Sequence, residues 1–185
     1  MTGRHAGILA VLLALAAAVA AGRDAPTTAV AQPTSPSRDG LEARIKALES
    51  LIPDQAHIMA DVGDHFTNLW FAGTARNWPL ADFYLNETKS HLHWAVRRIP
   101  IRKDNKGRDI DLIKILEAFE TSQLAQLKRT IDGKDEPGFE RVYRESLTVC
   151  YSCHKAADKP YLRPRVPTEP ETRIINFDTD ATWPL

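Results

Sequence analysis

The sequence predicts an all-α protein: an antiparallel four-helix bundle, preceded by a short extra helix and followed by an extended, proline-rich tail. Apolar residues recur at helical spacing through four long segments of similar length. Proline and glycine stand at the borders of these segments, where helices begin and end. No stretch shows the sustained alternation of apolar and polar residues that a half-buried strand requires.

The first two helices are expected on either side of Pro53. A short amphipathic helix is predicted over residues 40–51, where leucine and isoleucine side chains share one face. Pro53 interrupts this pattern, because proline lacks the backbone N–H that a helix interior needs. The first long helix is predicted to follow over residues 54–74.

End signals place the other three long helices, predicted over residues 79–99, 109–132 and 136–157. Pro79 suits the first turn of a helix, where its missing N–H costs nothing. Gly133 suits the position just after a helix. Lys159-Pro160 stops the last helix.

The start of the chain has the features of a secretory signal peptide, predicted over residues 1–21. Arg4 gives it a positive start, and residues 7–21 form an apolar run that is short for a membrane span. Ala18-Val19-Ala20 matches a cleavage site. We therefore expect export, followed by cleavage and no stable membrane insertion.

Segments of biased composition flank the helical region, which is predicted as one domain over residues 40–159. Residues 22–39 are rich in Ala, Thr, Pro and Ser, as in a flexible tether. Residues 160–185 contain five prolines and are expected to be extended. Because apolar residues lie near the end of this tail, it is expected to pack against the bundle rather than remain disordered.

Cys150-Tyr151-Ser152-Cys153-His154 is the most informative stretch of the chain. Its C-x-x-C-H spacing is the attachment signature of a c-type haem. On a helix the two thiols and the imidazole point to one side, since they stand at positions i, i+3 and i+4. The motif predicts one covalently bound haem c, with His154 as a ligand to its iron.

Two other kinds of C-x-x-C site remain as alternatives. A thioredoxin-like redox pair needs a βαβ context, which the pattern of this chain does not provide. A structural zinc site needs two more ligands, and Cys150 and Cys153 are the only cysteines in the chain.

Met59 is the candidate second iron ligand, on the first long helix. At about 100° per residue it lies at the centre of the apolar face, within about 60° of Phe66 and Trp70. Once Met1 leaves with the signal it is the only methionine, and a thioether is a usual sixth ligand in low-spin cytochromes. The alternative is a methionine that fills a gap in the core. His65, His91 and His93 are expected to be half-exposed helix residues rather than ligands, and His57 is expected on the opposite, polar face of its helix.

Composition and localisation narrow the functional classes. The chain carries 24 basic and 24 acidic residues, so charge gives no reason to expect a nucleic-acid partner. Export agrees with the motif, because bacterial c-type haem is attached outside the cytoplasm, and the periplasm is the expected location.

With this signal, this motif and these helices, the chain resembles the class II c-type cytochromes, the group of cytochrome c-prime and its low-spin relatives. The resemblance covers about residues 54–157 and implies covalent haem attachment at Cys150 and Cys153, with His154 as the proximal ligand. Low-spin members place a methionine where Met59 stands. High-spin members have an apolar residue there and leave the iron five-coordinate.

The expected function is one-electron transfer by a mono-haem cytochrome that serves redox partner proteins. The alternative is a five-coordinate cytochrome c-prime-like protein that binds nitric oxide or carbon monoxide. A haem-bearing module of a larger complex is a third interpretation, and members of this group often form homodimers. No second catalytic constellation is found, so an enzyme is not expected.

Phe83 and Trp94 fall on the polar side of their helix, where the tail or a second subunit is expected to cover them.

Overall fold

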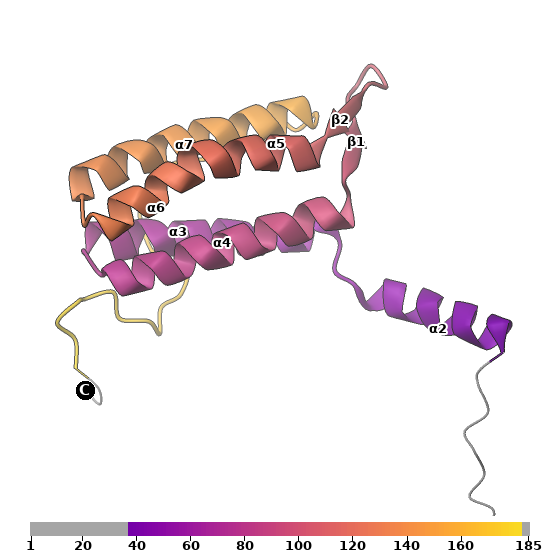
Figure 1. Cartoon of the computed structure of the whole chain (residues 1–185), viewed down its shortest axis with the longest axis horizontal. Coiled ribbons are helices and arrows are strands. Elements are labelled where there is room, and N and C mark those ends of the chain that lie inside the picture. The colour runs from indigo at the N-terminus through magenta and orange to yellow at the C-terminus, as the bar shows by residue number, and fades with distance from the viewer. Residues whose placement is uncertain (1–36, 183–185) are drawn as a thin grey trace, which may run out of the picture. The chain divides into compact units, whose positions relative to one another are not determined.

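A computed structural model describes residues 37–182 of the chain, and the described residues are mostly helical, as the all-α prediction requires (Figure 1). The signal peptide predicted over residues 1–21, most of the tether and the last three residues lie outside this range. The chain divides into two compact units between Lys46 and Ala47. No helix of the described residues is both long enough and apolar enough to cross a bilayer.

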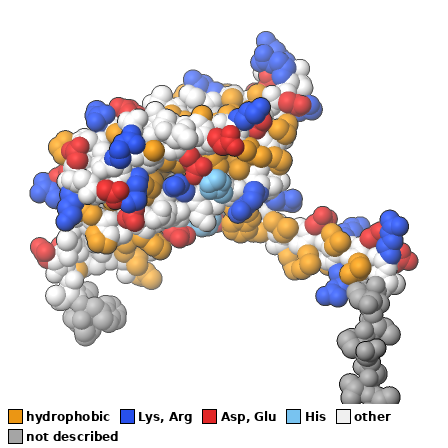
Figure 2. All heavy atoms as spheres, in the orientation of Figure 1, with side chains coloured by type: hydrophobic (Ala, Val, Ile, Leu, Met, Phe, Trp, Pro, Cys, Tyr) orange, Lys and Arg blue, Asp and Glu red, His pale blue; other side chains and the backbone are white. Residues whose placement is uncertain are grey.

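Helix α2 (Arg38–Leu51) confirms the short helix predicted over residues 40–51. It is amphipathic, yet none of its residues is buried. Its apolar face shows as a row of hydrophobic side chains along the helix (Figure 2) and includes Leu41, Ile45, Leu48 and Leu51.

Helices α3 (Gln55–Thr74) and α4 (Trp78–Arg98) begin at the predicted signals. The Asp54 carboxylate accepts a hydrogen bond from the backbone N–H of His57, which satisfies one of the free donors of the first turn. The Asn77 side chain accepts in the same way from Leu80, and proline follows in the first turn of α4.

A small hairpin after α4 was missed by the sequence prediction, which had a polar loop followed by a helix from residue 109. Strands β1 (Ile101–Lys103) and β2 (Asp109–Asp111) pair antiparallel, with Arg102 opposite Ile110. The Asp104 carboxylate closes the loop by accepting backbone N–H bonds from Lys106 and Arg108. Three residues per strand are too few to show an alternating pattern.

The third long helix runs from residue 112 to residue 132 in three sections: α5 (Leu112–Phe119), the π-helical η1 (Glu120–Leu124) and α6 (Ala125–Asp132). Gly133 ends it as predicted. Buried positions recur every three or four residues except for one step of five, from Phe119 to Leu124. A π-helical turn adds the extra residue, and both side chains thereby remain on the core side.

Helix α7 (Glu136–Ala156) confirms the fourth predicted helix. The Asp135 carboxylate caps its start by accepting from the backbone N–H of Gly138. At its end Asp158 adopts φ 60°, a left-handed conformation that aspartate tolerates better than most residues.

The long helices form two layers, α3 with α4 and α5–α6 with α7 (Figure 1). The main core cluster lies between the layers toward the α6–α7 turn. It is rich in aromatic side chains, among them Phe66, Tyr84, Phe119, Phe139 and Tyr143.

The tail after α7 lies against α3 and α4, as the sequence predicted. The ring of Phe177 contacts those of Phe71 and Tyr84, with centroids 6.1 and 6.2 Å apart. The side-chain amide of Asn68 donates to the hydroxyl of Thr172 over 2.8 Å. Asn68 is buried although it is a polar residue, because the tail packs on its side of α3. Helical periodicity carries no information about such a segment. The tail leaves Phe83 52 % exposed.

Candidate cofactor-binding site

Helices α3 and α7 run antiparallel and are in close contact at the end of the unit near the α6–α7 turn. The Tyr143 hydroxyl on α7 donates to the backbone carbonyl of Phe66 on α3 over 2.9 Å, and their rings stack at 4.4 Å. One turn farther, the ring of Phe139 fills the space beside Gly73, where a Cβ would lie 2.2 Å from ring atoms. We call this region the packed end.

The same register places Met59 level with the cysteine motif. Met59 stands seven residues before Phe66, and Cys150 stands seven residues after Tyr143. Seven residues are two helical turns, so in an antiparallel pair both lie about 10 Å along from the Phe66–Tyr143 contact. Met59 and Cys150 therefore occupy corresponding positions on facing helices.

Burial between these helices stops before that level is reached. The last buried residue of α7 is Ser146, and every residue from Leu147 to Ala156 is half-buried or exposed. The two layers diverge toward the β-hairpin (Figure 1). We call this region the open end.

The face of α3 that carries Met59 is correspondingly uncovered. Met59 is half-buried, while Ala56 and Gly63 on the same face are exposed, and nothing lies within 4 Å of a Cβ built at Gly63. The expectation that Met59 is the centre of the buried face was therefore wrong for this half of α3. Here the buried side chains are those of Ile58 and Val62. The stripe through Met59, Phe66 and Trp70 is continuous, but α7 covers only its second half.

The motif residues lie together on one side of α7. Cys150, Cys153 and His154 are half-buried, whereas Ser152 and Lys155 are exposed. Cys150 packs against the core cluster and so marks the border between the packed and open ends. Neither cysteine is in a disulfide.

The thiols do not have the properties of a reactive redox pair. Burial, with a smaller contribution from the nearby Cys153, raises the pKa of the Cys150 thiol to about 12. Burial also raises the pKa of Cys153. Catalytic C-x-x-C thiols instead have lowered pKa values, because the thiolate is the nucleophile. This argues against the thioredoxin-like alternative.

A zinc site needs at least three ligand atoms close together, and in the part of the chain that the structure describes no such group contains Cys150 or Cys153. The one group of His, Cys, Asp and Glu there whose ligand atoms lie close enough to share a metal ion contains neither cysteine. The structural zinc site is therefore not supported either.

His154 is held in a defined orientation by the backbone of the tail. Its Nδ1 lies 2.9 Å from the carbonyl oxygen of Leu162. A carbonyl oxygen can only accept, so Nδ1 carries the proton and Nε2 keeps its lone pair free for a metal. A hydrogen bond of this kind typically orients a histidine that ligates a metal.

A tight reversal after α7 brings Leu162 back to the motif. The backbone N–H of Lys159 donates to the carbonyl of His154 over 2.8 Å, and that of Leu162 donates to the carbonyl of Lys159. The Tyr151 hydroxyl donates to the Pro160 carbonyl over 3.3 Å. Sequence reasoning missed the role of this segment, since a backbone carbonyl belongs to any residue type. The only signal was an aspartate followed by Lys-Pro at the helix end.

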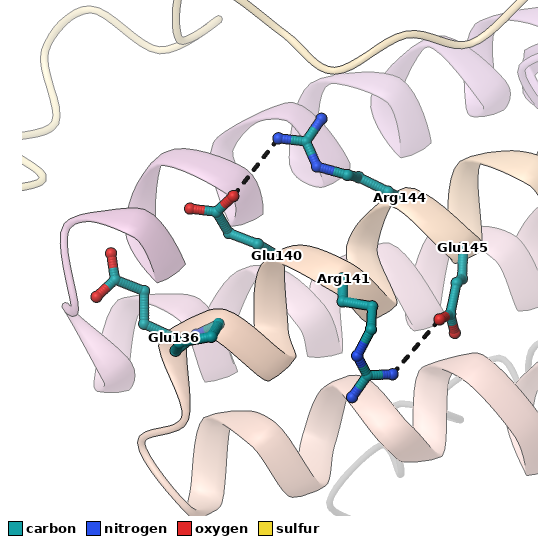
Figure 3. A pocket seen from close by; sticks show the side chains of 6 residues that line it. Glu136, Glu140, Arg141, Arg144 and Glu145 are labelled. Atoms are coloured by element: carbon teal, nitrogen blue, oxygen red, sulfur yellow. Dashed lines mark hydrogen bonds and ion pairs between the residues drawn. The ribbon is translucent and has the colours of Figure 1, made fainter.

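A shallow surface hollow lies elsewhere, on the exposed side of the first half of α7. Figure 3 shows its lining, in which Glu140 pairs with Arg144 and Arg141 pairs with Glu145, each over one helical turn. Such solvent-exposed ion pairs contribute little to stability, and they do not form a ligand-binding site.

Two of the other histidines have local partners. His57 contacts the carboxylate of Asp54 at the start of α3, and His93 contacts that of Glu120 in η1. Both are exposed, as expected for His57 on the polar face of α3, and more exposed than expected for His93.

Comparisons of the chain with models of protein families, with curated proteins and with solved structures gave no match.

Proposed function

We propose that this chain is an exported mono-haem c-type cytochrome of the class II kind that transfers single electrons. In this proposal α3, α4, α5–α6 and α7 form an antiparallel four-helix bundle with the haem in its core. The thiols of Cys150 and Cys153 hold the haem covalently, His154 is the proximal ligand and Met59 is the distal ligand.

The observation that carries the proposal is the position of the motif opposite an uncovered apolar stripe. The half-buried motif residues of α7 are level with Met59 on α3, and small residues flank Met59 on the same face. A large, flat, apolar group attached to the cysteines would cover surface that both helices leave exposed. The residues present therefore fit a haem.

The orientation of His154 supports the same assignment. The Leu162 carbonyl fixes the tautomer in which Nε2 is free, and it holds the imidazole ring in one orientation. When bound, the haem supplies a one-electron iron couple whose potential depends on the axial ligands and on burial. The chain holds the ring, supplies the ligands and limits access of water. A methionine opposite His154 would raise the reduction potential.

A gas-binding protein is the second candidate, and the half-exposure of Met59 favours it. If Met59 does not reach the iron, the distal side is bordered by Ala56 and Gly63, which offer no ligand atom. Nitric oxide or carbon monoxide would then bind directly.

The visible spectrum of the ferrous mature protein, recorded with and without carbon monoxide, separates the two candidates. We expect a low-spin, six-coordinate spectrum that carbon monoxide changes slowly or not at all. The Met59→Leu variant should become high-spin and bind carbon monoxide at once. His57→Gln is the matched control, because His57 lies on the same helix and contacts Asp54 instead. A parent protein that is already high-spin would refute the electron-transfer candidate and support gas binding.

Export and partners belong to the same proposal. Cleavage of the signal after about residue 21 would release the protein into the periplasm, where it would exchange electrons with redox partner proteins and pair as a homodimer. N-terminal sequencing of the mature protein tests the first point, and analytical ultracentrifugation tests the last.

A further inference from the structure

Three potential metal ligands meet between α3 and α4, away from the cysteine motif. The imidazoles of His65 and His91 and the carboxylate of Glu87 each offer a ligand atom, and these atoms all lie within 4.8 Å of one another. The two imidazole rings are 4.6 Å apart, centroid to centroid. All three residues are half-buried.

The helices determine this arrangement. Glu87 and His91 stand one turn apart on α4, so their side chains lie on the same face. His65 precedes Phe66, and a step of one residue turns its side chain about 100° from the stripe that faces α7. Its ring instead lies 6.2 Å from that of Tyr84 on α4. The group therefore sits on the α4 side of α3, separate from Met59.

The two imidazoles have nitrogen atoms free for a ligand. His91 Nδ1 lies 3.0 Å from the backbone carbonyl oxygen of Glu87, so it carries the proton and leaves the Nε2 lone pair unused. His65 Nδ1 is buried and has no hydrogen-bond partner among the described residues. A buried polar atom without a partner is unfavourable, and a bound ion is one way to satisfy it.

We propose that His65, Glu87 and His91 bind one divalent first-row transition-metal ion. Two imidazoles and a carboxylate suit zinc, copper, nickel or iron(II) better than magnesium or calcium, which prefer oxygen ligands. Donors about 2.1 Å from an ion lie at most about 4.2 Å apart, so small side-chain rotations complete the site. A carboxylate oxygen of Asp61 lies 3.9 Å from His91 Nε2 and could serve as a further ligand.

Equilibrium dialysis of the full mature protein against zinc, after treatment with a chelator, tests the site. We use zinc because it is redox-inert, and elemental analysis measures it independently of iron. The expected result is one zinc ion per chain. His65→Gln, His91→Gln and Glu87→Gln should each weaken binding by more than about tenfold, since loss of even an outer-shell partner costs about 10–100-fold.

His93→Gln is the matched control. His93 also lies on α4, two residues after His91, but it contacts Glu120 instead of the proposed metal site. It should bind zinc like the parent. The Glu87 variant keeps both histidines and the side-chain volume, and circular dichroism establishes that each variant is folded. No stoichiometric zinc, or equal binding by the parent and all three folded variants, would overturn the proposal. Neither result depends on whether haem is attached at Cys150 and Cys153.

Discussion

The packed end and the open end of the helical unit use the same two helices in opposite ways. At the packed end α3 and α7 touch so closely that Gly73 has no room for a methyl group beside Phe139. At the open end Gly63, on the same face of α3, has nothing within 4 Å. One stripe of α3 therefore changes from core to surface within three turns.

The open end is held together differently from the packed end. Its buried polar link is Gln55, whose amide donates to the Ala95 carbonyl over 2.8 Å and accepts from Arg102 over 2.6 Å. These bonds join the start of α3 to the end of α4 and to β1, but not to α7. The contrast indicates that stability is concentrated at the packed end, and that the open end is available for chemistry.

The largest effect on the free energy of unfolding is expected when an aromatic side chain is removed from the core at the packed end. Phe139→Ala should lower the free energy of unfolding by about 3–5 kcal/mol, since it leaves a cavity where no residue can collapse easily. Urea unfolding of the mature protein measures this. Phe83→Ala is the control with the same atoms removed from an exposed site, and it should cost much less. Similar costs for both would mean that the packed end is not the stabilising region.

Thiol reactivity tests the border between the two ends. In the chain produced without haem, burial raises the pKa of the Cys150 thiol to about 12, well above that of a free thiol, so very little of it is thiolate near neutral pH. A short pulse of iodoacetamide should therefore modify Cys150 slowly, at a rate that rises with pH. Peptide mass mapping measures this. The control is the same pulse in denaturant, where the protection should disappear. Rapid modification of Cys150 in the folded chain would contradict its position against the core.

The two glycines of α3 form a matched pair. Gly73→Ala should lower the free energy of unfolding by about 1–3 kcal/mol, because the Phe139 ring must move to make room for the methyl group. Gly63→Ala should stabilise the haem-free chain by about 0.5–1 kcal/mol, since the methyl group meets nothing and alanine favours the helix. Thermal unfolding of both variants gives the signs. If the two substitutions change the free energy of unfolding in opposite directions, the difference between the packed and open ends is supported. Changes in the same direction would contradict it.

A comparably small effect is expected from the loss of one hydrogen bond at the packed end. Tyr143→Phe should cost about 1 kcal/mol, because it removes the bond to the Phe66 carbonyl and keeps the stacked ring. Tyr161→Phe is the exposed control and should change the free energy of unfolding little. A cost for Tyr143→Phe no larger than that control would show that the bond does not secure the contact.

Much of the fold could be predicted because its signals are local. The side chains of Asp54 and Asn77 accept backbone N–H bonds at helix starts, and Gly133 directly follows the last residue of α6. The π-helical turn also had a local signal, the step of five residues between Phe119 and Leu124, but such a step is easily taken for a gap in a regular stripe. The hairpin had no comparable signal in its three-residue strands.

The site was predicted only in part, since periodicity gives the direction of a side chain but not what covers it. Helical angles placed Met59 correctly on the stripe through Phe66 and Trp70. They did not show that α7 leaves this half of the stripe open. The Leu162 carbonyl near His154 depends on the path of the tail, and the grouping of His65 with His91 depends on the pairing of α3 with α4.

The central claim is that Cys150 and Cys153 carry a covalently attached haem at the open end. The most direct test is the intact mass of the denatured mature protein, purified from cells competent to mature c-type cytochromes, together with its absorption. We expect the mass of the processed polypeptide plus one haem, and a coloured protein that keeps its colour after denaturation. A colourless protein with the mass of the polypeptide alone would contradict it.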